Sequence, residues 1–232
     1  MRTDKYLCDC LGITRSEAKN LIKTAKVFID GTKVSSPDLK FDECKAVVTV
    51  NGQEITYEKH VYFMLNKPAG LVSATKDESA TVIDLFKGEN RKGLFPVGRL
   101  DKDTVGLLII TDDGDLAHRL MSPRHHVDKT YKVGIRSSLS NSDIEALEKG
   151  LDIGEGETTG PATVKVIDPE TILLTISEGK YHQVKRMLEA VGNKVLTLKR
   201  ISIGSVALDE SLKEGEYRRL TPSELKALND NV

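Results

Sequence analysis

The sequence contains no tryptophan, few other aromatic residues and only three cysteines among its 232 residues. Cys8, Cys10 and Cys44 are too few and too unevenly spaced for a disulfide framework, and no second Cys/His pair follows Cys8 and Cys10 at zinc spacing. No apolar run approaches the roughly 20 residues of a membrane span, and no apolar signal region follows the charged N-terminus. These absences favour a cytoplasmic protein with free thiols and no membrane partner.

The chain also has almost no net charge, only -1, which by itself argues against binding to nucleic acid. The distribution of charge points the other way. Residues 117–136 hold five Lys/Arg against one acid, 180–200 hold six against one, and 1–26 hold six against three. Three basic clusters in a neutral chain favour a one-sided basic surface for a polyanion.

The N-terminal part predicts a small helical and hairpin unit. Residues 4–11 predict a short helix, and Thr14 with Glu17 forms a capping box for a second helix that ends near Lys26. An Asp-Gly turn in 27–34 predicts a hairpin. Because residues 51–60 are polar, we expect one domain over 1–58 and a second over 59–232.

The second part predicts strands and helices that do not alternate in clean βαβ units, which favours an α+β fold with a mainly antiparallel mixed sheet flanked by helices. Its clearest strand is the apolar run 107–110. Gly98 and Gly106 bracket a polar loop just ahead of that strand, and loops on such scaffolds often carry chemistry. The other expected elements are helices over 81–86, 113–121, 142–150, 181–191 and a last one capped at Thr221, and strands over 46–50, 61–65, 129–133, 163–167, 171–176, 195–198 and 206–208.

Four motifs carry a family resemblance. They are Asn-Lys-Pro-Ala-Gly at 66–70, Gly-Arg-Leu-Asp-x-x-Thr-x-Gly-Leu-Leu at 98–108, Lys-Thr-Tyr at 129–131 and Glu-Gly-Lys-Tyr-His-Gln-Val-Lys-Arg-Met at 178–187. Together they resemble the pseudouridine synthases that modify ribosomal RNA, most closely the group that acts on the small subunit. The N-terminal unit resembles the α-L RNA-binding domain of ribosomal protein S-four.

The resemblance implies three catalytic-site residues. Asp101 is the expected catalytic residue, Tyr131 is expected to face the target base, and Lys185 is expected to pair with Asp101. A carboxylate serves as nucleophile or base, and a neighbouring cation keeps it ionised and oriented. Relatives often have arginine in place of Lys185, and lysine lacks its planar fork. The reaction is an isomerisation, so no cofactor and no metal are expected.

Basic and polar side chains near these motifs are expected to hold the RNA while the target base leaves its stack. The expected RNA-binding residues are Arg15, Lys19, Lys23, Arg99, Thr104, Arg119, Arg124, Lys129, Arg186 and Arg200. The acidic residues near Asp101 and the pair His125–His126 are interpreted as turn, cap or surface groups, because their spacing does not suit a metal site.

The resemblance implies that a monomer converts a uridine of 16S ribosomal RNA, at position 516 in E. coli-type numbering. It leaves open whether the RNA is free or in a partly assembled particle, and whether Asp101 attacks the sugar or the base. The alternatives are a large-subunit synthase of the same group and a non-catalytic ribosome-assembly factor. An aspartate-dependent phosphotransferase or hydrolase would need a phosphate-cradling glycine loop, which the sequence lacks in the expected form.

Overall fold

The computed structural model describes residues 1–24, 26–89 and 91–230. The chain forms two compact units, one of Met1–Val61 with Gly88–Gly93 and the other of Tyr62–Lys87 with Leu94–Val232. The first unit therefore runs past residue 58 and takes in a later loop. No helix in the described ranges is both long and apolar enough to cross a membrane.

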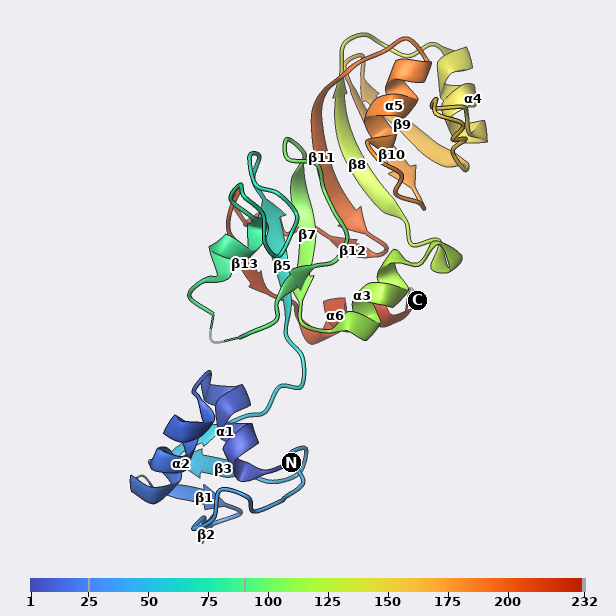
Figure 1. Ribbon diagram of the computed structural model, residues 1–232. Coiled ribbons are helices and arrows are strands. Elements are labelled where there is room, and N and C mark those ends of the chain that lie inside the picture. Colours follow the sequence, from blue (N-terminus) through green and yellow to red (C-terminus); the bar gives the residue numbers. More distant parts are fainter. Residues whose placement is uncertain (25, 90, 231–232) are drawn as a thin grey trace. The chain divides into compact units, whose positions relative to one another are not determined.

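The first unit packs two helices against a small antiparallel sheet in the order β2-β1-β3-β4 (Figure 1). Its elements are α1 (Thr3–Leu11), α2 (Arg15–Thr24), β1 (Val27–Ile29), β2 (Thr32–Lys33), β3 (Val48–Val50) and β4 (Gln53–Ile55). The predicted capping box of α2 is confirmed, because the Thr14 N–H donates to Glu17 over 2.7 Å and the Glu17 N–H donates to Thr14 Oγ1 over 3.3 Å. The predicted hairpin is also confirmed, with Asp30 and Gly31 both at positive φ in its turn.

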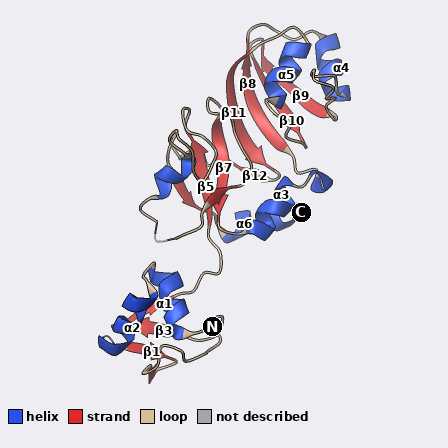
Figure 2. Ribbon diagram, viewed as in Figure 1, coloured by secondary structure: helices blue, strands red, loops and turns tan. Residues whose placement is uncertain are grey.

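The second unit is built on one long twisted sheet in the order β13-β5-β7-β11-β8-β10-β9, with β6 added to β7 and β12 to β11 (Figure 2). Its strands are β5 (Tyr62–Lys67), β6 (Phe95–Pro96), β7 (Val105–Thr111), β8 (Lys129–Ile135), β9 (Ala162–Asp168), β10 (Thr171–Ile176), β11 (Val195–Ile203), β12 (Val206–Ala207) and β13 (Tyr217–Arg219). Its helices are η1 (Val82–Phe86), α3 (Gly114–Met121), η2 (Pro123–His125), α4 (Asn141–Lys149), α5 (Gln183–Ala190) and α6 (Pro222–Asp230).

The prediction of a mainly antiparallel mixed sheet is confirmed. Within the described ranges, β7 and β11 form the single parallel pair among its ladders. The predicted helix 113–121 is confirmed as α3, whose first turn is capped by Asp113. Leu116 and Leu120 of α3 pack with Leu107 and Ile109 of β7, so this helix covers one face of the sheet. The fully buried stretch of β7 explains its continuous apolar sequence.

Two predicted helix starts and one helix type need correction. The helix expected from Ser142 begins at Asn141, because the capping pair is Ser140 with Asp143. The helix expected from Tyr181 begins at Gln183, because His182 adopts a left-handed conformation that cannot continue a helix. The helix expected over 81–86 is the 3₁₀ segment η1. The short strands β4, β6 and β13 were not predicted.

Candidate active site

The loop that carries Asp101 joins β6 to β7 and is placed by a close approach of two strands. Gly106, at a φ of 102°, faces the backbone of Arg200, and a Cβ at this position would collide with the Arg200 carbonyl oxygen. The glycine therefore lets β7 run beside β11 with Gly106 opposite Arg200. Arg200 in turn lies opposite Tyr131 of β8. The three strands thus bring the Asp101 loop to the Tyr131 side chain.

A buried lysine holds this loop through hydrogen bonds to its backbone carbonyls. Lys67, at the end of β5, is fully buried, and its ammonium donates to the carbonyls of Pro68 (3.0 Å), Asp101 (3.1 Å), Lys102 (3.3 Å) and Thr104 (2.9 Å). Burial lowers the pKa of Lys67 to about 8. The carbonyl dipoles favour the charged form, so the ammonium is retained at neutral pH. Lys67 was not among the predicted site residues.

A second contact fixes the other side of the loop. Ser73 Oγ donates to the Leu100 carbonyl over 2.9 Å and accepts from the Leu100 N–H over 3.1 Å. The backbone on both sides of Asp101 is therefore hydrogen-bonded to the body of the unit. A loop held in this way keeps its carboxylate in one position.

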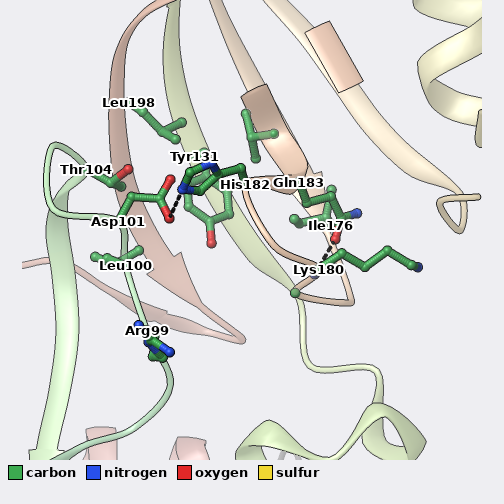
Figure 3. Close-up of a pocket in the computed structure, with 12 residues that line it drawn as sticks. Arg99, Leu100, Asp101, Thr104, Tyr131, Ile176, Lys180, His182, Gln183 and Leu198 are labelled. Carbon is green, nitrogen blue, oxygen red and sulfur yellow. Dashed lines mark hydrogen bonds and ion pairs between the residues drawn. The ribbon is translucent and has the colours of Figure 1, made fainter. Parts of the chain in front are cut away.

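Asp101 opens on a cavity with a narrow recess and a wider bowl. The recess, about 70 Å³, and the bowl, about 620 Å³, share Asp101, Tyr131 and His182 in their walls. Figure 3 shows these three side chains close together, and Ile176 and Leu198 add apolar surface to the lining of the recess. The bowl falls in the size range of ligand pockets. The lining of the cavity combines a carboxylate, a phenol and apolar side chains, a combination that suits a planar, polar nucleobase.

Two cationic or ionisable side chains lie against the Asp101 carboxylate. Lys185 Nζ of α5 is 3.2 Å from Asp101 Oδ2, and His182 Nε2 is 3.5 Å from Asp101 Oδ1. Lys185 also contacts Asp103, at 2.7 Å and 2.9 Å from its two carboxylate oxygens. Burial lowers the pKa of Lys185, but hydrogen bonds to Asp103 and Asp101 outweigh burial and raise it overall. The hydrogen bond from Lys185 also lowers the pKa of Asp103. The structure thus brings Lys185 to Asp101, as predicted, and adds a second carboxylate partner.

Two further cations are buried in the wall of the bowl. Lys129 is 7% exposed and donates to the Val127 carbonyl over 2.9 Å, and Arg200 is 3% exposed and donates from Nε to the Leu107 carbonyl over 2.8 Å. Burial and the nearby Arg200 charge lower the pKa of Lys129. Arg200 Nη2 is buried and finds no hydrogen-bond partner in the described ranges. Buried charges without a carboxylate are costly, and a bound anion would offset that cost.

The other predicted residues of this unit differ in their placement. Arg99 lines both parts of the cavity, and Thr104 lines the recess, with a buried hydroxyl that has no partner among the described residues. Arg119 donates to Asn229 Oδ1 over 2.9 Å, and Arg124 is exposed on η2. Neither lines the cavity.

Arg186 is bound to the protein rather than turned into the cavity. Its guanidinium donates to the carbonyls of Ile153 (3.0 Å) and Gly154 (2.9 Å) and to the Glu157 carboxylate. This differs from the expectation that Arg186 holds RNA directly. The physical reason is the helical offset from Lys185, which turns neighbouring side chains to different faces.

Arg15, Lys19 and Lys23 lie on α2 of the first unit and are all exposed. Ala18 and Ile22 of the same helix are buried, so the basic residues occupy its outer face. No cluster of three or more His, Cys, Asp or Glu side chains suited to a metal occurs in the part of the chain that the structure describes.

Comparison with known proteins gives consistent matches over nearly the whole chain. A family model described as RNA pseudouridylate synthase matches residues 61–190. An uncharacterized RNA pseudouridine synthase of Bacillus subtilis is 47% identical over 236 residues, which cover 99% of each chain. The ribosomal small subunit pseudouridine synthase A of Vibrio cholerae is 45% identical over 230 residues, 98% of this chain and 99% of its own. A crystal structure of a pseudouridylate synthase matches with a TM-score of 0.70 at 42% identity, covering 98% of this chain and 99% of its own.

Proposed function

Because this chain belongs to the RNA pseudouridylate synthase family, we propose that it converts a uridine of small-subunit ribosomal RNA to pseudouridine, with Asp101 as the catalytic residue. The observation that carries the assignment of Asp101 is its position. It is a carboxylate on a fixed loop, paired with Lys185 and facing the same cavity as Tyr131. The small-subunit substrate is inferred from the printed name of the relatives.

The reaction needs one reactive carboxylate and no co-reactant. The bond from the ribose to the ring nitrogen of uracil breaks, the base turns, and the ribose joins carbon 5. Carbon 5 then loses its proton, and the freed ring nitrogen gains one. Asp101 acts as nucleophile or base at the sugar or at the base. Lys185, with its ammonium 3.2 Å from Asp101 Oδ2, orients the carboxylate.

Tyr131 is suited to hold the base and to move its proton. Tyr131 is largely buried and lines the recess together with the apolar side chains of Leu198 and Ile176. Its hydroxyl is a candidate acceptor for the proton of carbon 5. Stacking on such a ring also compensates in part for extracting the base from the RNA, which costs a few kcal/mol.

The cations of the bowl are suited to the RNA backbone. Lys129 and Arg200 donate to backbone carbonyls, Arg200 Nη2 has no hydrogen-bond partner among the described residues, and Arg99 lies at the same cavity. We assign all three to phosphate oxygens near the target nucleotide. The exposed basic face of α2 is assigned to other phosphates of the RNA, in keeping with the S-four-like pattern of the first unit.

The finer assignment is uridine 516 of 16S ribosomal RNA, modified in the cytoplasm by a monomer. The alternatives are a uridine of the large subunit and a role in ribosome assembly without catalysis. The protein would be incubated with unmodified transcripts of the small-subunit and the large-subunit ribosomal RNA. It would also be incubated with small-subunit particles rebuilt from the small-subunit transcript. Pseudouridine would be mapped by a chemical label that adds mass to it.

We expect one labelled site in the small-subunit RNA or particle. Asp101→Asn should lower the rate by roughly 10⁶-fold, the scale on which removal of a catalytic nucleophile acts. Asp103→Asn, in the same loop and also beside Lys185, is the matched control and should remain active. A site only in the large-subunit RNA would exclude the small-subunit assignment, and an active Asp101→Asn variant would exclude the catalytic one. Tight binding without any conversion would favour the assembly factor.

A further inference from the structure

Tyr181 lies at the rim of the bowl and is the most exposed large apolar side chain among the described residues, at 73%. The reaction chemistry assigns it no role. An aromatic ring left in water beside a binding cavity is a common feature of surfaces that stack nucleobases. Its surroundings indicate which base it would meet.

One face of the Tyr181 ring is already covered. It stacks on the His182 imidazole, with ring centroids 3.8 Å apart and planes 21° apart. His182 in turn reaches the Asp101 carboxylate, at 3.5 Å. The two rings therefore form a continuous wall from the reactive carboxylate out to solvent, with the second face of Tyr181 open.

The backbone beneath this wall is fixed. His182 has a left-handed conformation, with φ 48° and ψ 32°, which turns the chain just before α5. Arg186 donates to the Tyr181 carbonyl over 3.2 Å while it is held by Glu157 and the Ile153 carbonyl. A ring on an ordered backbone loses little further freedom when a ligand binds. Arg186 thus holds the backbone that carries the Tyr181 ring.

The charges nearby favour a nucleotide over an apolar protein segment as the occupant. Arg99 and Lys102 line the same bowl as Tyr181, so an anionic backbone would be stabilised next to the ring. When the target uridine leaves the RNA stack, its neighbour loses a stacking partner. An exposed aromatic ring that lines the same bowl as Asp101 offers such a partner.

We propose that Tyr181, backed by His182, stacks on the nucleobase adjacent to the target uridine and so contributes to substrate selection. This inference rests on the proposed function, because it takes RNA as the ligand.

The test uses synthetic hairpins that span uridine 516, intact or with an abasic site 5′ of the target, 3′ of it, or at the target. The full-length protein is compared with Tyr181→Ala and Tyr181→Phe.

Leu196→Ala is the matched control, because Leu196 is also a large exposed apolar side chain, at 61%, but does not line the cavity. Tyr181→Ala should weaken binding of the intact hairpin by about fivefold to 100-fold, the range for losing one stacked base. Tyr181→Phe should restore most of the affinity. The loss should disappear on one of the two hairpins that lack a flanking base.

Equal binding of Tyr181→Ala and wild type to the intact hairpin would overturn the proposal. So would a loss that persists on both flanking abasic hairpins, or one that disappears only when the target base is missing. Conversion by the wild type is scored separately, on the transcripts and rebuilt small-subunit particles described above. Absent conversion there is the failure of the proposed function, whereas unchanged binding of the intact hairpin by Tyr181→Ala is the failure of the stacking proposal.

Discussion

The two units of the chain use basic side chains in opposite ways. In the second unit Lys67, Lys129 and Arg200 are buried near Asp101, each bound to backbone carbonyls. In the first unit the basic residues of α2 are Arg15, Lys19 and Lys23, which are all exposed. Burying a cation is costly unless something compensates it, whereas an exposed cation costs almost nothing. Each buried cation must therefore act at one defined position. The exposed cations of α2 act together, through the total charge that they present.

Lys67 should give the largest effect, because it holds the backbone of the Asp101 loop. Lys67→Met leaves the carbonyls of Asp101, Lys102 and Thr104 without their donor. We expect the free energy of unfolding to fall by about 1–3 kcal/mol. The single-turnover rate should fall by roughly 100-fold, the cost of a small displacement of a catalytic group. Lys76→Met, at an exposed lysine of the same unit, should change neither.

Lys67 should also produce a characteristic dependence of stability on pH. Its pKa is about 8 in the folded protein, below the ordinary value of 10.5. Between these values the unfolded chain binds a proton that the folded protein has released, so the free energy of unfolding should rise with pH. Urea unfolding at pH values from 7.5 to 10 should show this rise in wild type relative to Lys67→Met. Parallel curves for the two proteins would mean that Lys67 has an ordinary pKa.

Lys67 also illustrates what the sequence could predict. The apolar strand, the Pro-Gly turn after it and the motif that contains Lys67 are all local patterns. That the ammonium is buried depends on carbonyls from residues 101–104, which only the pairing of β5 with β7 brings to it. Asp103, which was not predicted as a partner, approaches Lys185 more closely than Asp101 does, and this contact also joins residues far apart in the sequence.

Local backbone conformation was the other feature that could not be predicted from the sequence. The amphipathic pattern of 181–191 identified α5 correctly, but nothing in it marks His182 as left-handed, since histidine at positive φ is uncommon. The Tyr181–His182 stack depends on that turn and was therefore not predicted. The capping pair Ser140–Asp143 was missed because Ser142 offers an equally good pattern two residues later.

The next effect concerns Lys185, which lies between the buried and exposed classes and contacts two carboxylates. Lys185→Met removes the charge beside Asp101 and keeps most of the side-chain bulk. A charge-assisted hydrogen bond of about 1.5–3 kcal/mol corresponds to a loss of roughly 10-fold to 100-fold in single-turnover rate. Lys185→Arg should recover much of the rate. A Met variant with the wild-type rate would show that Asp101 does not need this cation.

Lys129 tests whether a buried cation is retained for RNA at the expense of stability. Lys129→Met removes a buried charge that donates a hydrogen bond to the Val127 carbonyl and is only partly compensated by the nearby Asp128. The melting temperature should therefore stay level or rise, because an apolar side chain replaces a poorly compensated ion. Affinity for the RNA should fall by about tenfold, equal to the loss of one charge-assisted phosphate contact. A lower melting temperature with unchanged affinity would make Lys129 a structural residue.

The smallest effect is expected from the exposed cations of α2, and it should appear mainly in the dependence of affinity on salt. Each phosphate contact releases counterions, so the slope of log affinity against log salt scales with the number of contacts. Replacing Arg15, Lys19 and Lys23 together by Gln should make the slope shallower by about 2 to 3 units if all three contact phosphate. The control replaces Lys33, Lys40 and Lys45 by Gln, which gives the same change in net charge at exposed positions of the same unit outside α2. If the slope depended only on net charge, the two triple variants would behave alike, and α2 would have no special part in binding. A shallower slope for the α2 variant alone, with the conversion rate of bound RNA unchanged, would show that the exposed face of α2 holds the RNA while the buried cations act at the target.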